Sequence, residues 1–284
     1  MNPSKVVLGV AVLAAATLLA VAGGSSAETF PASPWKELHN SRVRLLSAPA
    51  AAPGRPLVAG IEVALADGWK TYWRMPGDAG VPPNFDWKGS SNVGAVKVLY
   101  PAPARLPEAG GEAIGYKKTV IFPVEIVPED PSRPIALKLA MEFGVCREIC
   151  IPAEAALDLT VASGKAGPVP RDLAAALDRV PRSAAARRHG DPKLDKASIA
   201  AAGSASRLLI EARFGKGARG TDLFIEAPEG LFVPLAKKAS EDASGTARFA
   251  SEISADLLKD LKGKTLTFTL VSEAGASEAQ WTVP

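Results

Sequence analysis

Short segments of alternating, β-branched or aromatic residues recur along almost the whole chain and limit it to a β-rich fold. Turn-forming clusters such as Met75–Asp78 and Val81–Asn84 separate them, and their prolines cannot continue a helix. Many short strands with turn signals and little helical periodicity predict an all-β sandwich. The segments expected in the first part of the chain are Arg42–Leu46, Leu57–Leu65, Trp69–Trp73, Val93–Tyr100, Thr119–Val127, Ile135–Phe143 and Ala155–Val161.

The same pattern returns in the last part of the chain, without cysteines. Between the two β regions, Pro170–Arg179 contains good helix formers, with a proline suited to the first turn and Pro181 as a stop. We therefore predict two β-sandwich domains, 28–163 and 192–284, joined by a linker with one short helix at 164–191. The strands expected in the second domain are Arg207–Phe214, Asp222–Glu226, Leu231–Pro234, Thr246–Ile253, Thr265–Ser272 and Glu278–Val283, with a helical turn at Ala255–Leu261.

The first residues have the pattern of an export signal. Lys5 precedes an apolar run from Val6 to Val21, and small residues then lead to Ala27, after which Glu28 follows. This order of charged, apolar and small residues predicts a signal peptide at 1–27. The run is shorter than the ~20 residues of a membrane span, although a retained N-terminal anchor is the alternative. We expect an exported chain with no membrane insertion after cleavage.

Charge and the remaining motifs exclude several classes of function. The formal net charge of +3 over 284 residues does not predict nucleic-acid binding, and the basic run at Arg187–His189 fits a solvated linker. His39 and His189 are the only histidines and lie far apart in the sequence. There is no phosphate-binding glycine loop and no zinc-binding spacing, so we predict no cofactor.

Cys146 and Cys150 are the only cysteines of the chain. Apolar and polar residues alternate in Leu137–Phe143 before the pair, and a strand is expected at Ala155–Val161 after it. The pair is therefore expected at the connection between two strands. A disulfide there would persist in an oxidising compartment, but it would close a very small ring and remove little entropy from the unfolded chain. This favours a redox pair over a structural staple. Arg147 would favour a thiolate and Glu148 would oppose it.

A copper site is a further alternative, since Met141 and the two cysteines are soft ligands that suit Cu(I). Methionine in an alternating strand is, however, more often a core residue.

Several motifs together resemble the N-terminal periplasmic domain of the DsbD family, in particular its ScsB-like branch, which is linked to suppression of copper sensitivity. The resemblance spans about 35–161, and the second β region resembles the additional immunoglobulin-like domain of that branch. The motifs are Gly68–Gly80, Pro101–Arg105, Gly115–Tyr116, Phe122–Val124 and Val145–Pro152.

The resemblance implies an immunoglobulin-like sandwich that receives electrons from a membrane-embedded thiol reductase and passes them to periplasmic disulfide proteins. Cys146 and Cys150 would be the exchanging pair. In the family a cap loop covers the disulfide, and Leu106–Tyr116 lies at the matching place, with Ile114 and Tyr116 as the covering side chains. The alternative for Tyr116 is a structural role, as an aromatic residue that packs at the beginning of a strand.

The aromatic residues Trp69, Tyr72 and Trp73 are expected to fill the core rather than to take part in chemistry. Asp78 is expected to form a turn.

Two departures from the family pattern narrow the prediction. The cysteine spacing is shorter than in enterobacterial DsbD, and no transmembrane bundle or thioredoxin-like domain follows the second β region. We therefore predict a periplasmic thiol–disulfide exchange module whose electron donor is a separate protein. The alternatives are a non-enzymatic β-sandwich interaction protein with a structural disulfide, and a copper-handling periplasmic protein.

Overall fold

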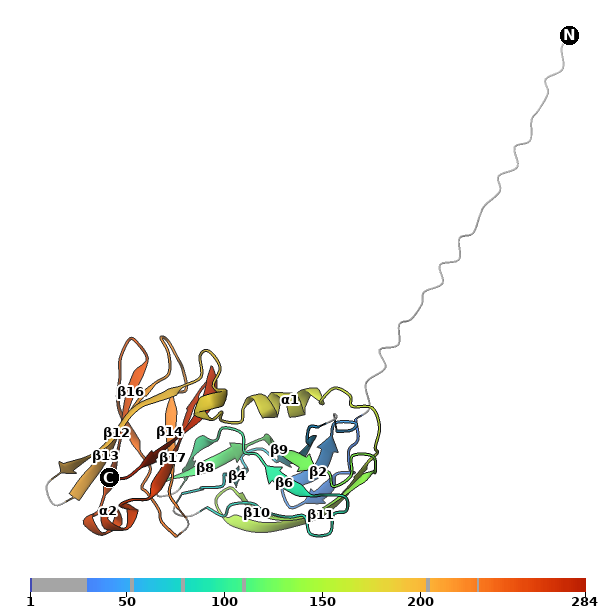
Figure 1. Cartoon of the computed structure of the whole chain (residues 1–284), viewed down its shortest axis with the longest axis horizontal. Helices are drawn as coiled ribbons and strands as arrows, with labels where there is room; N and C mark the ends of the chain where they lie inside the picture. Colours follow the sequence, from blue (N-terminus) through green and yellow to red (C-terminus); the bar gives the residue numbers. More distant parts are fainter. Residues whose placement is uncertain (2–29, 52–53, 78–79, 109–110, 203–204, 229) are drawn as a thin grey trace.

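The computed structural model describes residue 1 and residues 30–284, apart from 52–53, 78–79, 109–110, 203–204 and 229. Figure 1 shows two β regions next to each other along the long axis of the molecule, with one helix lying along the first of them. The predicted signal peptide after residue 1 and the predicted turn residue Asp78 lie outside the described residues. The all-β prediction is confirmed, because strands dominate both regions.

Two antiparallel sheets form the first β region. The first has the order β1 (Lys36–Leu38), β2 (Ser41–Ser47), β3 (Leu57–Leu65), β9 (Thr119–Val127), β6 (Ala95–Val98). The second has the order β11 (Cys150–Val161), β10 (Ile135–Cys146), β4 (Lys70–Tyr72), β8 (Gly111–Lys117), β7 (Ala104–Glu108), and β5 (Asn84–Asp86) pairs with β10.

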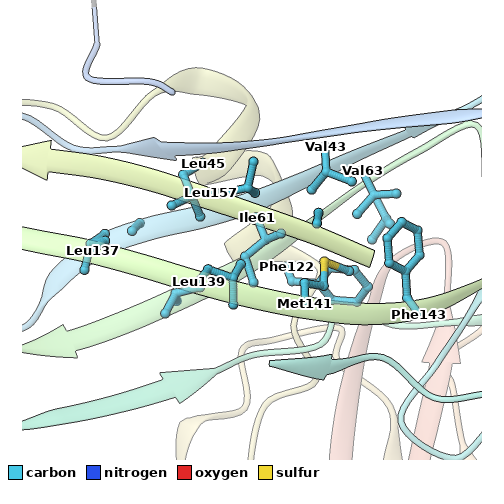
Figure 2. Close-up of a cluster of buried hydrophobic side chains, with 14 of the residues drawn as sticks. Val43, Leu45, Ile61, Val63, Phe122, Leu137, Leu139, Met141, Phe143 and Leu157 are labelled. Atoms are coloured by element: carbon cyan, nitrogen blue, oxygen red, sulfur yellow. The ribbon is translucent and has the colours of Figure 1, made fainter. Parts of the chain in front are cut away.

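The core of this region lies between the two sheets. In β10 the buried and exposed positions alternate from Ile135 to Glu142, as expected for a strand with one face against a core. Phe122 is fully buried and packs in tilted or edge-to-face geometry with neighbouring aromatic rings. Met141 belongs to the same core, as Figure 2 shows, so the core interpretation of this methionine is confirmed.

The second β region has its own two antiparallel sheets and its own core. Their orders are β12 (Lys193–Ala202), β13 (Ala205–Arg213), β16 (Thr246–Ile253), β15 (Lys237–Glu241), and β14 (Asp222–Glu226), β17 (Thr265–Ser272), β18 (Gly275–Thr282). The predicted strand Leu231–Pro234 is wrong, since these residues form no strand. The predicted helical turn is α2 (Ala255–Leu261), which Ser254 caps by accepting the N–H of Leu257.

The segment between the regions contains the expected helix, α1 (Arg171–Asp178), and a short 3-10 turn at Ala184–Ala186. Leu173 and Ala176 pack on Leu46 and Ile121, on the outer face of the first sheet. Gly60 makes this possible, because a Cβ there would lie 2.8 Å from the side chain of Leu173. Within the described ranges, no helix has the length and apolar character needed to cross a membrane.

Candidate functional site

The two cysteines face each other across the hairpin that joins β10 and β11. Cys146 ends β10, Cys150 begins β11, and the two are register partners whose Cα atoms lie 4.1 Å apart and whose sulfurs form a disulfide. The N–H of Arg147 donates to the carbonyl of Ile149 across the intervening loop. The prediction that the pair lies at a connection between two strands is confirmed, and both strands continue further than expected, up to the cysteines themselves.

The two sulfur-bearing residues differ in their access to solvent. Cys146 is 1% exposed and packs with Tyr72 and Ala113, whereas Cys150 is exposed. Gly144, just before this point in β10, leaves room for the Tyr72 ring, since a Cβ there would lie 3.1 Å from it. Of the two residues that form the bridge, Cys150 is therefore the one that solvent reaches.

A chain of polar groups leads from the bridge into the sheet. The Tyr72 Oη lies 2.9 Å from the Cys150 Sγ and 3.2 Å from the Glu108 Oε1. The single hydroxyl hydrogen of Tyr72 can be donated either to the Glu108 Oε1 or to the Cys150 Sγ, and a disulfide sulfur has no hydrogen to donate in return. The buried Lys70 places its Nζ 2.8 Å from the same Glu108 oxygen. The expectation that Tyr72 fills the core is confirmed for its ring, which is fully buried. Its hydroxyl lies at the disulfide site.

The Tyr72 hydroxyl stays protonated far above neutral pH. Burial, which is the largest cause, acts together with the negative charge of Glu108 and the hydrogen bond to its carboxylate to raise the pKa of Tyr72 to about 12. A neutral hydroxyl is a donor, and a hydrogen bond to a thiolate favours that charged form of sulfur. The site therefore keeps a protonated hydroxyl 2.9 Å from the Cys150 Sγ throughout the physiological range.

The hydroxyls of all three tyrosines are expected to ionise at a higher pH than a free tyrosine. Burial is the largest cause in each, raising the pKa of Tyr72 and of Tyr100 to about 12 and that of Tyr116 well above its ordinary value. Because an unfolded tyrosine ionises near pH ~10, the folded chain should bind more protons than the unfolded chain above that pH. Stability should be complete below pH ~10 and fall as the pH rises toward ~12. Tyrosinate absorbance and thermal unfolding against pH would check this, and tyrosinate appearing at pH ~10 in the folded protein would contradict it.

Residues 42–162 match the family model described as "Thiol:disulfide interchange protein DsbD, N-terminal". These residues are similar to the N-terminal domain of DsbD. Residues 179–284 match a domain of unknown function, DUF8393. The crystal structure of the N-terminal periplasmic domain of ScsB from Proteus mirabilis is similar in fold, with a TM-score of 0.69 and 22% identity over 90% of this chain and 99% of that chain. No curated protein matches the chain.

The stretch expected to form the cap is a β-hairpin of β7 and β8. Ile114 is 1% exposed within the core, and Tyr116 is buried there with its Oη donating to the Pro101 carbonyl at 2.8 Å. Their covering role stays a prediction. The members of this stretch that lie at the disulfide site are Ala113, which packs with Cys146, and Glu108, which contacts Tyr72.

The other predicted site residues lie apart from this chemistry. Trp73 fills the core as expected, and Trp69 is partly buried against it, with its ring edge-on to that of His39. Met141 points into the core, on the face of β10 opposite to the one that carries Cys146. Within the part of the chain that the structure describes, no group of three or more histidine, cysteine or acidic side chains could hold a metal ion.

Proposed function

We propose that the chain is a periplasmic thiol–disulfide exchange module, which relays electrons between a separate membrane thiol reductase and periplasmic disulfide proteins through Cys146 and Cys150. The observation that carries the proposal is the asymmetry of the bridge. One sulfur-bearing residue is exposed beside a neutral hydroxyl donor, and the other is buried behind it. The match of residues 42–162 to a thiol:disulfide interchange family supports the same function.

The geometry suits a two-step exchange. A thiolate of the reductase attacks the Cys150 Sγ, the bond to Cys146 breaks, and Cys146 leaves as a thiolate. The second thiolate of the reductase then attacks the reductase sulfur that is bonded to Cys150, and Cys150 is released as a thiolate. The reductase is thereby oxidised to a disulfide, and this chain is reduced to a dithiol. With a client, the Cys150 thiolate attacks one sulfur of the client disulfide and releases the other as a thiolate. Cys146 then attacks the Cys150 Sγ, which releases the first client sulfur as a thiolate and restores the Cys146–Cys150 bond.

The bridge is poorly suited to act as a staple. Cys146 and Cys150 are already paired by the β10–β11 ladder, which runs without interruption to Ile135 and Val161. The ring that the disulfide closes is small, so its contribution to the entropy of unfolding is also small. Reduction is therefore expected to leave the domain folded.

The compartment and the partners belong to the same proposal. Residues 1–27 have the order of an export signal, and disulfides persist in oxidising compartments. Ile149, in the loop between the cysteines, is 70% exposed and offers an apolar contact to a docking protein beside the reactive sulfur.

The reduction potential of the bridge tests the proposed function. The protein would be equilibrated with glutathione or dithiothreitol redox buffers, the thiols would be trapped by alkylation, and circular dichroism would report the fold. A potential above about −300 mV, in the range of exchange proteins, is expected, with the reduced protein still folded. A potential below that value, or unfolding on reduction, would favour the structural disulfide instead.

A further inference from the structure

We propose that the second β region positions the polar groups of the disulfide site, by holding β4 and the β7–β8 hairpin through one face of β14. This inference rests on the proposed redox function. It gives a role to the region that matches a domain of unknown function, and it identifies Arg105 and Arg74 as positioning residues.

Strand β14 contacts the first β region through alternate residues. Side chains two apart in a strand lie on the same face, and Asp222, Phe224 and Glu226 contact Arg105, Trp73 and Arg74 of the first region. The residues between them, Leu223 and Ile225, are buried in the core of the second region. The face turned away from that core is therefore an interdomain contact along its whole length.

Arg105 connects the hairpin to the second region. Its Nε lies 2.8 Å and its Nη2 2.9 Å from the two carboxylate oxygens of Asp222, and Nη2 also donates to the Ala236 carbonyl at 2.6 Å. The Nη1 of the same side chain donates to Glu112 of β8 at 3.0 Å. This planar fork thus joins both strands of the hairpin to β14, with the geometric specificity of a bidentate pair.

Arg74 makes the equivalent connection directly after β4. Its Nε and Nη2 each lie 2.7 Å from a carboxylate oxygen of Glu226, and Nη2 also contacts Glu278. The adjacent Trp73 ring packs on Phe224 with their centroids 5.8 Å apart.

The same strands carry the polar groups of the disulfide site. β4 supplies Lys70 and Tyr72, which stand on the face opposite to Trp73. β7 supplies Glu108, and β8 supplies Ala113. The contacts of Arg105 and Arg74 with β14, on one side of these strands, therefore fix the position of the hydroxyl, carboxylate and ammonium groups on the other side.

The reduction potential of an Asp222→Asn variant of the full chain tests this inference. Loss of the carboxylate leaves the partly buried Arg105 without its anionic partner and loosens the hairpin that carries Glu108. Because the Tyr72 hydroxyl binds a thiolate more strongly than a disulfide sulfur, looser positioning should disfavour the reduced form about tenfold, which shifts the potential by about −30 mV. The matched control is Glu211→Gln, which breaks an exposed ion pair with Arg248 in the same region and should leave the potential unchanged.

Each outcome decides the inference. If Asp222→Asn does not fold by circular dichroism, Arg105→Lys takes its place, since lysine keeps the charge but loses the fork. A folded variant with the wild-type potential would overturn the inferred positioning role of the second β region, but not the proposed redox function. A wild-type potential below about −300 mV would overturn the proposed function, and this inference with it.

Discussion

A Cys146→Ser variant is expected to form a stable mixed disulfide at Cys150. The exposed Cys150 thiol keeps its access to a partner and its contact with the Tyr72 hydroxyl, while the thiol that would resolve the intermediate is missing. Incubation with oxidised glutathione should give close to one adduct per chain by mass spectrometry. The reduced wild-type chain should return to its internal disulfide with almost no adduct, because the two cysteines are register partners.

The matched control is Cys150→Ser, which leaves only the Cys146 thiol. Because Cys146 is 1% exposed beneath Tyr72 and Ala113, its adduct should form on the order of 100-fold more slowly, which corresponds to about 2.7 kcal/mol of barrier. Both variants should keep the wild-type circular dichroism spectrum. Equal rates in the two variants would show that burial does not distinguish the sulfurs, and loss of fold in both would support a structural bridge.

Truncating Phe122 is expected to have the largest effect on stability. Its ring is fully buried and lies 5.6, 5.3 and 5.4 Å, centroid to centroid, from Phe85, Tyr100 and Tyr116. A Phe122→Ala change removes this packing and leaves a cavity, so it should cost about 3–5 kcal/mol of unfolding free energy. Urea unfolding followed by circular dichroism would measure the loss.

Val127 offers a control on the same strand. It ends β9 with 47% of its surface exposed, so Val127→Ala should change the unfolding free energy by less than about 0.5 kcal/mol. If the Phe122 variant lost no more stability than this control, the aromatic cluster would not be the centre of the core.

Much of the fold could be predicted from periodicity, and its failures have physical causes. Alternation through Leu137–Phe143 gave the centre of β10 correctly, whereas the end of the strand depended on pairing with β11 as far as Cys150. The apolar Leu231–Pro234 run suggested a strand, but Val233 is buried without a strand partner in the described ranges. Strand β12 was missed because its alanine-rich sequence has low β propensity, and pairing with β13 overrides this.

The candidate site could be predicted only where its residues are close in sequence. The spacing of Cys146 and Cys150 was enough to place them around a turn. Lys70 and Glu108 were missed because they reach the bridge through strand pairing, which local patterns do not contain. Lys70 is on β4, which pairs with β10, and Glu108 is on β7, which pairs with β8 beside β4. Tyr72 was placed in the core because aromatic residues usually fill a sandwich, and only its hydroxyl departs from that rule.

The burial of Cys146 behind an exposed Cys150 would also constrain the order of events in the proposed relay. One accessible sulfur cannot accept a sulfur atom from two proteins at once, so donor and client must occupy the same spot in turn. Such alternation would give double-displacement kinetics, in which the donor reacts with the oxidised form of the chain and the client with the reduced form. The supply of electrons to any one client would then depend on how quickly the previous partner leaves the exposed cysteine.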